Sequence, residues 1–252
     1  MNSEMRFLGV DLAPNHSGWV CLGERGQLLD LAFLTDRAAS VKGRSGCGYC
    51  LPVPKVDDPE VRDLLRLDRA LPVFEALLER FRPSFVGLEG YAFGSVTGAH
   101  SKGEFGGLFR LVVWRSGAPL RVHDPMTVKK FVAGSGSAEK EDMISSIVAA
   151  GGPDYTTYCD GSKGGLVVAG DLADAHGLAL MVRAEWMLRT GRLSLSSLLP
   201  HQLEVVNRVT KASPVALLQR GWIADTRKGA ETDRASGGVC QAIVGGRMNE
   251  VD

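Results

Sequence analysis

Four acidic residues stand where metal-dependent chemistry could use them. Asp11 ends the apolar run in LGVDLA, and Glu89 ends the run in FVGLEGY. Asp171 and Asp174 lie three residues apart in GDLADAHGLAL, so on a helix they share one face. Several carboxylates buried together are costly unless a cation neutralises them. Their oxygens suit Mg²⁺ or Mn²⁺ better than zinc, so the four acids predict a divalent-metal site for phosphoester chemistry.

Each acid taken alone has a simpler interpretation. An Asp after a strand often caps a turn, and Asp171, beside Gly170, could be the N-cap of a helix. The joint pattern favours the metal site, because a shared cation relieves the repulsion among clustered carboxylates.

The elements that must position these acids predict an α/β fold. Residues 6–35 form three strands of an antiparallel meander, and a polar loop covers 36–57. Asp58 and Pro59 then begin a helix that ends near Phe81, with a kink or break expected at Pro72. The later predicted elements are strands in SFVGLEG and APLRVHDP and helices over 98–115, 127–132, 139–150 and 171–190.

This order is that of a ribonuclease H-like mixed sheet, with three antiparallel strands, then parallel strands, and flanking helices. Asp11 falls on the central strand, and Glu89 falls at the end of its parallel neighbour. We expect one domain over 1–193. A C-terminal extension over 194–252 is helical near 200–219 and has a Gly-rich, flexible tail.

Composition narrows the function classes only slightly. The chain has 29 basic and 29 acidic residues, and this zero net charge neither supports nor excludes nucleic-acid binding. No apolar run approaches the roughly 20 residues of a membrane span, and the chain enters a strand-like segment at once. These features predict a cytoplasmic protein without a membrane partner.

The cysteines allow one further metal site. Five cysteines are an odd number, which is consistent with reduced thiols. Cys47 and Cys50 form a single CxxC, and a zinc site would need two more ligands, which Cys159 or a histidine could supply in space. Two free thiols in a Gly-rich loop are the simpler interpretation.

Four stretches of the sequence, in this order, carry motifs of one known enzyme family. GVDLAPNHSGW places Ser17-Gly18-Trp19 where the family has Thr-Gly-aromatic, and LEGYAF places Glu89 at the second catalytic carboxylate. VKKFVAGSGSAEKEDM follows the family's Val-Lys-Lys, Gly-x-Gly and Ala-x-Lys string without gaps, and DLADAHGLAL matches its Asp-x-x-Asp-Ala helix. On these four stretches the chain resembles the RuvC-type Holliday-junction resolvases of the ribonuclease H-like superfamily, over about residues 6–190. Leu12-Ala13 in place of Pro-Gly, and His176 in the last helix, depart from it.

The resemblance implies an active site and its cofactors. The catalytic and metal-binding residues would be Asp11, Glu89, Asp171 and Asp174. Lys140 would assist as a cation near the developing charge, although a solvated helix explains it too. Two Mg²⁺ or Mn²⁺ ions about 3.5–4 Å apart could activate a water and stabilise the leaving oxygen, with Asp11 bridging them.

The same resemblance implies how DNA is held. Candidate contacts are Lys129, Lys130, Ser17 and Ser135, the last between two glycines that let backbone approach a phosphate. Tyr91 or Phe93 would wedge into the junction, with a core aromatic as the alternative. The helix over 103–114 would form a homodimer, although packing against the sheet explains its residues almost as well.

The leading hypothesis is therefore a metal-dependent endodeoxyribonuclease that nicks two strands of branched DNA symmetrically. An ATPase or sugar-kinase relative of the same fold is one alternative, but the second phosphate-binding hairpin that it needs is not visible. A catalytically silent branched-DNA-binding scaffold is the other.

Overall fold

A computed structural model describes residues 4–36, 47–51, 55–90, 99–158, 163–210 and 213–224. Within them, six strands form one mixed sheet in the order β4-β3-β2-β1-β5-β6. β1 (Arg6–Leu12), β2 (His16–Gly23) and β3 (Leu28–Thr35) are antiparallel neighbours, and β5 (Phe85–Glu89) and β6 (Leu120–His123) continue parallel to β1. The predicted ribonuclease H-like sheet is confirmed. One correction concerns the predicted 36–57 loop, where β4 (Gly48–Cys50) pairs in parallel with β3.

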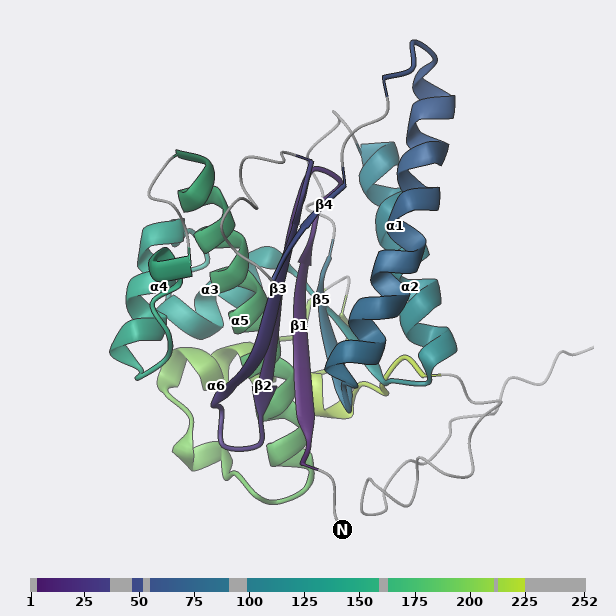
Figure 1. The fold of residues 1–252 in the computed structure, drawn as a ribbon. Coiled ribbons are helices and arrows are strands. Elements are labelled where there is room, and N and C mark those ends of the chain that lie inside the picture. Colours follow the sequence, from purple (N-terminus) through teal and green to yellow (C-terminus); the bar gives the residue numbers. More distant parts are fainter. Residues whose placement is uncertain are drawn as a thin grey trace, which may run out of the picture.

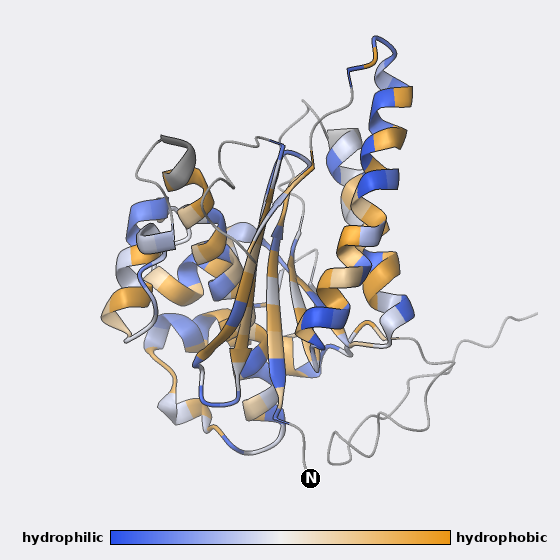
Figure 2. Cartoon of the chain, viewed as in Figure 1, coloured by the Kyte–Doolittle hydropathy of each residue, from blue (hydrophilic) through white to orange (hydrophobic). Residues whose placement is uncertain are grey.

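Helices cover both faces of this sheet (Figure 1). α1 (Pro59–Phe81) and α2 (Ala99–Ser116) lie on one face. α3 (Pro125–Ala133), α4 (Lys140–Ala149) and α5 (Lys163–Arg189) lie on the other. The strands between these two layers are largely hydrophobic (Figure 2).

The first helix begins as predicted but does not break. The Asp58 carboxylate accepts hydrogen bonds from the backbone N–H groups of Glu60 and Val61 at 2.9 and 3.3 Å. Pro72 lies inside the continuous helix, contrary to the expected break. Pro72 and Asp68, whose carbonyl loses its helical partner, are both exposed, so water can bond to that carbonyl.

α5 begins eight residues before its predicted start at 171, so Asp171 lies inside the helix and does not cap it. Gly164 and Gly165 suggested a loop in the sequence. Val168 and Ala169 pack into the core, however, and this burial outweighs the weak helix propensity of the two glycines.

The C-terminal extension packs on the same domain. α6 (Pro200–Asn207) lies against α3. Farther on, Leu120 on β6 and Ile223 exchange two backbone hydrogen bonds of 2.8 and 3.0 Å, which covers the edge strand. The predicted division after residue 193 stays a prediction, and residues 225–252 lie outside the described ranges.

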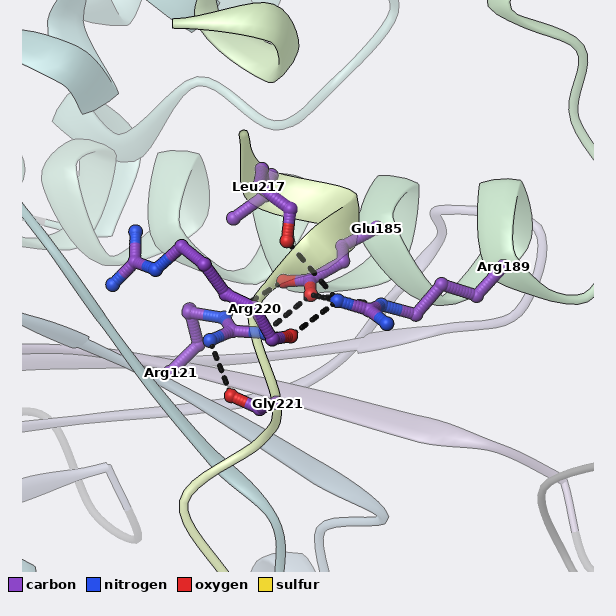
Figure 3. Close-up of polar contacts among 6 residues, drawn as sticks. All are labelled: Arg121, Glu185, Arg189, Leu217, Arg220 and Gly221. Carbon is purple, nitrogen blue, oxygen red and sulfur yellow. Dashed lines mark hydrogen bonds and ion pairs between the residues drawn. The ribbon is translucent and has the colours of Figure 1, made fainter. Parts of the chain in front are cut away.

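A buried ion-pair cluster holds this segment to α5 (Figure 3). Glu185 is fully buried and accepts hydrogen bonds from Arg121 at 2.5 and 3.0 Å and from Arg189 at 2.7 and 2.9 Å. Both guanidinium groups also donate to the backbone carbonyl of Arg220, and Arg121 lies 4.6 Å from the ring of Trp222. We call these residues (Arg121, Glu185, Arg189, Arg220 and Trp222) the C-terminal clasp.

The described part of the chain contains no helix long and apolar enough to cross a membrane. Cys47 packs against the core and Cys50 belongs to β4, while Cys159 lies outside the described residues. A zinc site on Cys47 and Cys50 therefore stays untested.

Candidate active site

Asp11 and Glu89 lie side by side because of strand alternation. On β1, Leu8 and Val10 pack under α1 and α2, so Asp11 belongs to the opposite face, which α5 covers. On β5, Val86 and Leu88 likewise pack under α1 and α2, so Glu89 belongs to the face that α5 covers. Val10 pairs with Leu88 in the parallel ladder, so the two acids follow at adjacent strand ends.

α5 can reach these acids because the strands carry glycine beneath it. A β-carbon on Gly9 would lie 1.9 Å from the carbonyl oxygen of Ala175, and one on Gly18 would lie 2.2 Å from that of Asp171. Gly87 on β5 meets α5 similarly, at 2.8 Å from the Leu178 oxygen. The helix backbone therefore rests directly on β1, β2 and β5, which brings Asp171 and Asp174 over the strand ends.

The electrostatics show that the four acids act on one another. Desolvation raises the pKa of Asp11 well above its usual value, and the charges of Glu89, Asp171 and Asp174 raise it further. Desolvation and the Asp174 charge raise the pKa of Glu89 to about 7, although a side-chain hydrogen bond with Asp11 opposes this. Desolvation likewise raises the pKa of Asp174 to about 6. This mutual repulsion is what a bound cation would relieve.

Lys140 reaches the cluster from the start of α4. Its Nζ lies 2.8 Å from Asp171 Oδ1, and its side chain crosses α5 at Gly170. Partial burial lowers the pKa of Lys140, but the Asp171 charge outweighs this and raises the pKa overall. Of the predicted lysines, Lys140 is the one that contacts a carboxylate of the cluster.

Asp171 has a second partner on β2. His16 Nδ1 lies 2.6 Å from Asp171 Oδ2, so both oxygens of this carboxylate are engaged. Asp171 is only 2% exposed, whereas the side chains of His16 and Lys140 are 41% and 39% exposed.

The donor set fits a hard divalent cation, since it offers four carboxylates, and burial together with neighbouring carboxylate charge raises the pKa of three of them, Asp11, Glu89 and Asp174. Among the described residues, no three His, Cys, Asp or Glu side chains are already spaced as ligands. Asp171 is held by His16 and Lys140, and Asp11 and Glu89 share a hydrogen bond. Asp11 and Glu89 would have to give up their shared hydrogen bond for a cation to bind both.

The predicted DNA contacts fall in different surroundings. The Lys129 charge lowers the pKa of both Glu89 and Asp174, which places this lysine beside the cluster. Lys130 instead forms an ion pair with Glu204 on α6. Ser135 is exposed in the turn after α3, where its Oγ is 3.0 Å from Ser137 Oγ.

Ser17 does not have its predicted place. It is 1% exposed, and its hydroxyl donates to the Ala13 carbonyl at 2.9 Å, so it shapes the turn between β1 and β2 rather than a DNA surface. Tyr91 and Phe93, the predicted wedge, lie outside the described residues. Phe105 and Phe109 of α2 are buried in the core, as the packing alternative expects.

Two kinds of site residue were not predicted from the sequence. His16 has no metal-site role that the sequence predicts, since its partner lies 155 positions away. Gly9, Gly18 and Gly87 are visible in strand segments, where an isolated glycine signals close approach by another backbone. That signal could have predicted that a helix packs closely on these strands, but not which helix.

The strand order and the acids at the strand ends define a ribonuclease H-like protein. No family model matches the sequence. The crossover junction endodeoxyribonuclease RuvC of Brevibacillus brevis is 30% identical over 141 residues, which cover 55% of this chain and 74% of the relative. Its namesake from Chloroflexus aurantiacus is 29% identical over 143 residues, with the same coverage.

Two solved structures are similar. Thermus thermophilus RuvC matches 74% of this chain and 97% of its own, with 21% identity and a TM-score of 0.49. The T. thermophilus RuvC complex with a Holliday junction substrate matches 71% and 96%, with the same identity and TM-score. On the sequence relatives, this chain belongs to the RuvC family of crossover junction endodeoxyribonucleases, which confirms the predicted resemblance and enzyme class.

Proposed function

We propose that this protein is a metal-dependent endonuclease that cuts Holliday junctions or related branched DNA by paired, symmetric nicking. The observation that carries the proposal is the seating of α5 on Gly9, Gly18 and Gly87, which gathers carboxylates from three elements at one sheet edge. The names of the sequence relatives support the substrate class.

Asp11, Glu89, Asp171 and Asp174 would hold Mg²⁺ or Mn²⁺, in a pair of sites. Such ions supply an activated water and a stabilised leaving oxygen for phosphodiester hydrolysis. The chain's own contribution is to keep the four acids together on a rigid sheet and helix, where burial and neighbouring carboxylate charge raise the pKa values of Glu89 and Asp174.

The cationic side chains have distinct roles in this proposal. Lys140 is held against Asp171 and would stabilise negative charge that develops at the reacting phosphate. Lys129 lies beside Glu89 and Asp174 and would attract the DNA backbone. The Gly134–Gly136 turn, with Ser135 exposed, would let backbone approach a neighbouring phosphate. Lys130 would first have to leave Glu204.

A homodimer would supply the two sites that symmetric nicking needs. α2 supports this proposal, because Leu111 is 40% exposed and a β-carbon on Gly103 or Gly107 would meet open space. Phe105 and Phe109 of the same helix are committed to the core. A wedge from Tyr91 or Phe93 remains part of the proposal. The ATPase alternative is set aside by family membership.

The test compares nicking of a synthetic four-way junction with nicking of linear duplex of the same sequence, in Mg²⁺ and in EDTA. We expect paired nicks on opposing strands of the junction, in Mg²⁺ only. Binding of the junction without cleavage would favour the silent scaffold, and equal cleavage of both DNAs would contradict the selectivity for branched DNA.

A further inference from the structure

His16 faces the active site from a strand that carries no predicted catalytic residue. It is the first residue of β2 and lies on the same face of the strand as Gly18. Because Gly18 has no side chain, the Asp171 backbone can rest on that strand. The imidazole Nδ1 is 2.6 Å from Asp171 Oδ2. The contact therefore joins β2 to α5 where the helix backbone rests on Gly18.

Contacts on either side of His16 hold its backbone in place. His16 pairs with Thr35 across the β2–β3 ladder. In the preceding turn, the Asn15 carbonyl accepts from the Asp36 N–H at 2.9 Å, and the Ser17 hydroxyl donates to the Ala13 carbonyl. Both sides of the residue are therefore tied to neighbouring segments, and the contact with Asp171 holds the imidazole against the acid cluster.

The chemistry of the pair assigns the hydrogen. An ionised carboxylate only accepts hydrogen bonds, so Nδ1 of His16 must donate to Asp171. Lys140 donates to the other oxygen, at 2.8 Å. The two donors fix the rotation of a carboxylate that is almost fully buried. One hydrogen bond to an oxygen leaves that oxygen further lone pairs, so a cation can still be bound.

We propose that His16 is a positioning residue of the active site, which orients the Asp171 carboxylate for divalent metal through its Nδ1–H donor. This inference rests on the proposed metal-dependent function and extends it to a residue on β2. Hydrogen bonds of this kind orient metal-binding carboxylates in general, and their loss weakens metal binding without removing a ligand.

The test measures Mn²⁺ binding by calorimetry on the full chain without DNA, for wild type, His16→Ala, His16→Asn and His201→Ala. We expect His16→Ala to weaken Mn²⁺ binding by about 10–100-fold. His16→Asn should recover most of the affinity, since its Nδ2 donor is as many bonds from the backbone as the histidine Nδ1. His201 lies on α6 against Gly134, so its removal should leave Mn²⁺ binding unchanged.

Three results would overturn the inference: wild-type affinity in His16→Ala, no recovery in His16→Asn, or an equal loss in His201→Ala. The recovery by asparagine separates orientation from folding, because a merely structural role for the ring would not be rescued by the smaller side chain. A wild-type protein that binds Mn²⁺ but does not nick a four-way junction would contradict the proposed function instead, and the His16 comparison would still stand.

Discussion

Gly170 and Lys140 are in such close contact that a β-carbon on Gly170 would lie 2.2 Å from Lys140 Cδ. The lysine crosses α5 at this glycine to reach Asp171. We expect Gly170→Ala to push the flexible lysine aside and lower cleavage by up to about 100-fold, as displacements near 1 Å can do. The helix itself should keep its stability, since alanine is the better helix former.

A double-mutant cycle checks this route. If Gly170→Ala acts through Lys140, it should add little to the loss already caused by Lys140→Ala. Additive losses in cleavage rate, measured on folded proteins, would show that the glycine acts on something else.

The seat of α5 gives a prediction about stability. In Gly9→Ala, the new methyl group would meet the backbone of Ala175 and Ala179, which cannot turn away as a side chain could. We expect a loss of about 1–3 kcal/mol in the free energy of unfolding. Gly221→Ala is the matched control, because its β-carbon would meet open space. If Gly9→Ala, Gly221→Ala and wild type all melt at the same temperature, direct contact between helix and sheet would be contradicted.

The C-terminal clasp predicts that the extension stabilises the nuclease domain. Arg121→Ala removes one of two partners of the fully buried Glu185, and we expect it to cost about 3–5 kcal/mol. Removing the surface ion pair with Glu204 through Lys130→Ala should cost far less, because such pairs are screened by solvent. Denaturant unfolding of the two variants measures the difference, and similar small losses would mean that the clasp adds nothing.

The raised pKa values of Glu89 and Asp174, about 7 and 6, predict how stability depends on pH. In the metal-free protein these groups hold protons more tightly when folded than when unfolded. Their contribution is therefore full below about pH 4 and is lost as the pH rises through 6 and 7.

Asp174→Asn isolates this effect, because it removes one titrating group. Relative to wild type, the variant should gain melting temperature between pH 5 and pH 7.5. Mg²⁺ should raise the melting temperature of wild type more at pH 7.5 than at pH 5.5, since the cation binds the deprotonated acids. At either pH it should raise that of Asp174→Asn less than that of wild type. A melting-temperature difference that stays constant with pH would contradict the shared charge of the cluster.

Much of this fold could be predicted from local sequence patterns. The alternation in residues 6–35 predicted the antiparallel strands. The apolar runs that end at Asp11 and Glu89 predicted that these acids lie near the ends of strands. The spacing of Asp171 and Asp174 gave their shared helix face. In each case the deciding interactions lie within one element.

The remainder depends on contacts between distant segments. β4 has three residues, too few for a visible alternation, and the clasp joins Arg121 to Glu185 on a helix far along the chain. His16 gains its meaning only from Asp171, which packing brings to it. The Ser17 hydroxyl, expected to contact DNA, instead donates to the Ala13 carbonyl in the turn between β1 and β2.

The central claim is that the acids brought together by α5 cut branched DNA. The most direct measurement is nicking of a four-way junction in Mg²⁺ by wild type and Asp11→Asn, with junction binding recorded for both. We predict that Asp11→Asn binds the junction as wild type does and that its cleavage falls below detection. Residual cleavage near the wild-type rate by a folded Asp11→Asn protein would contradict the assignment of the active site.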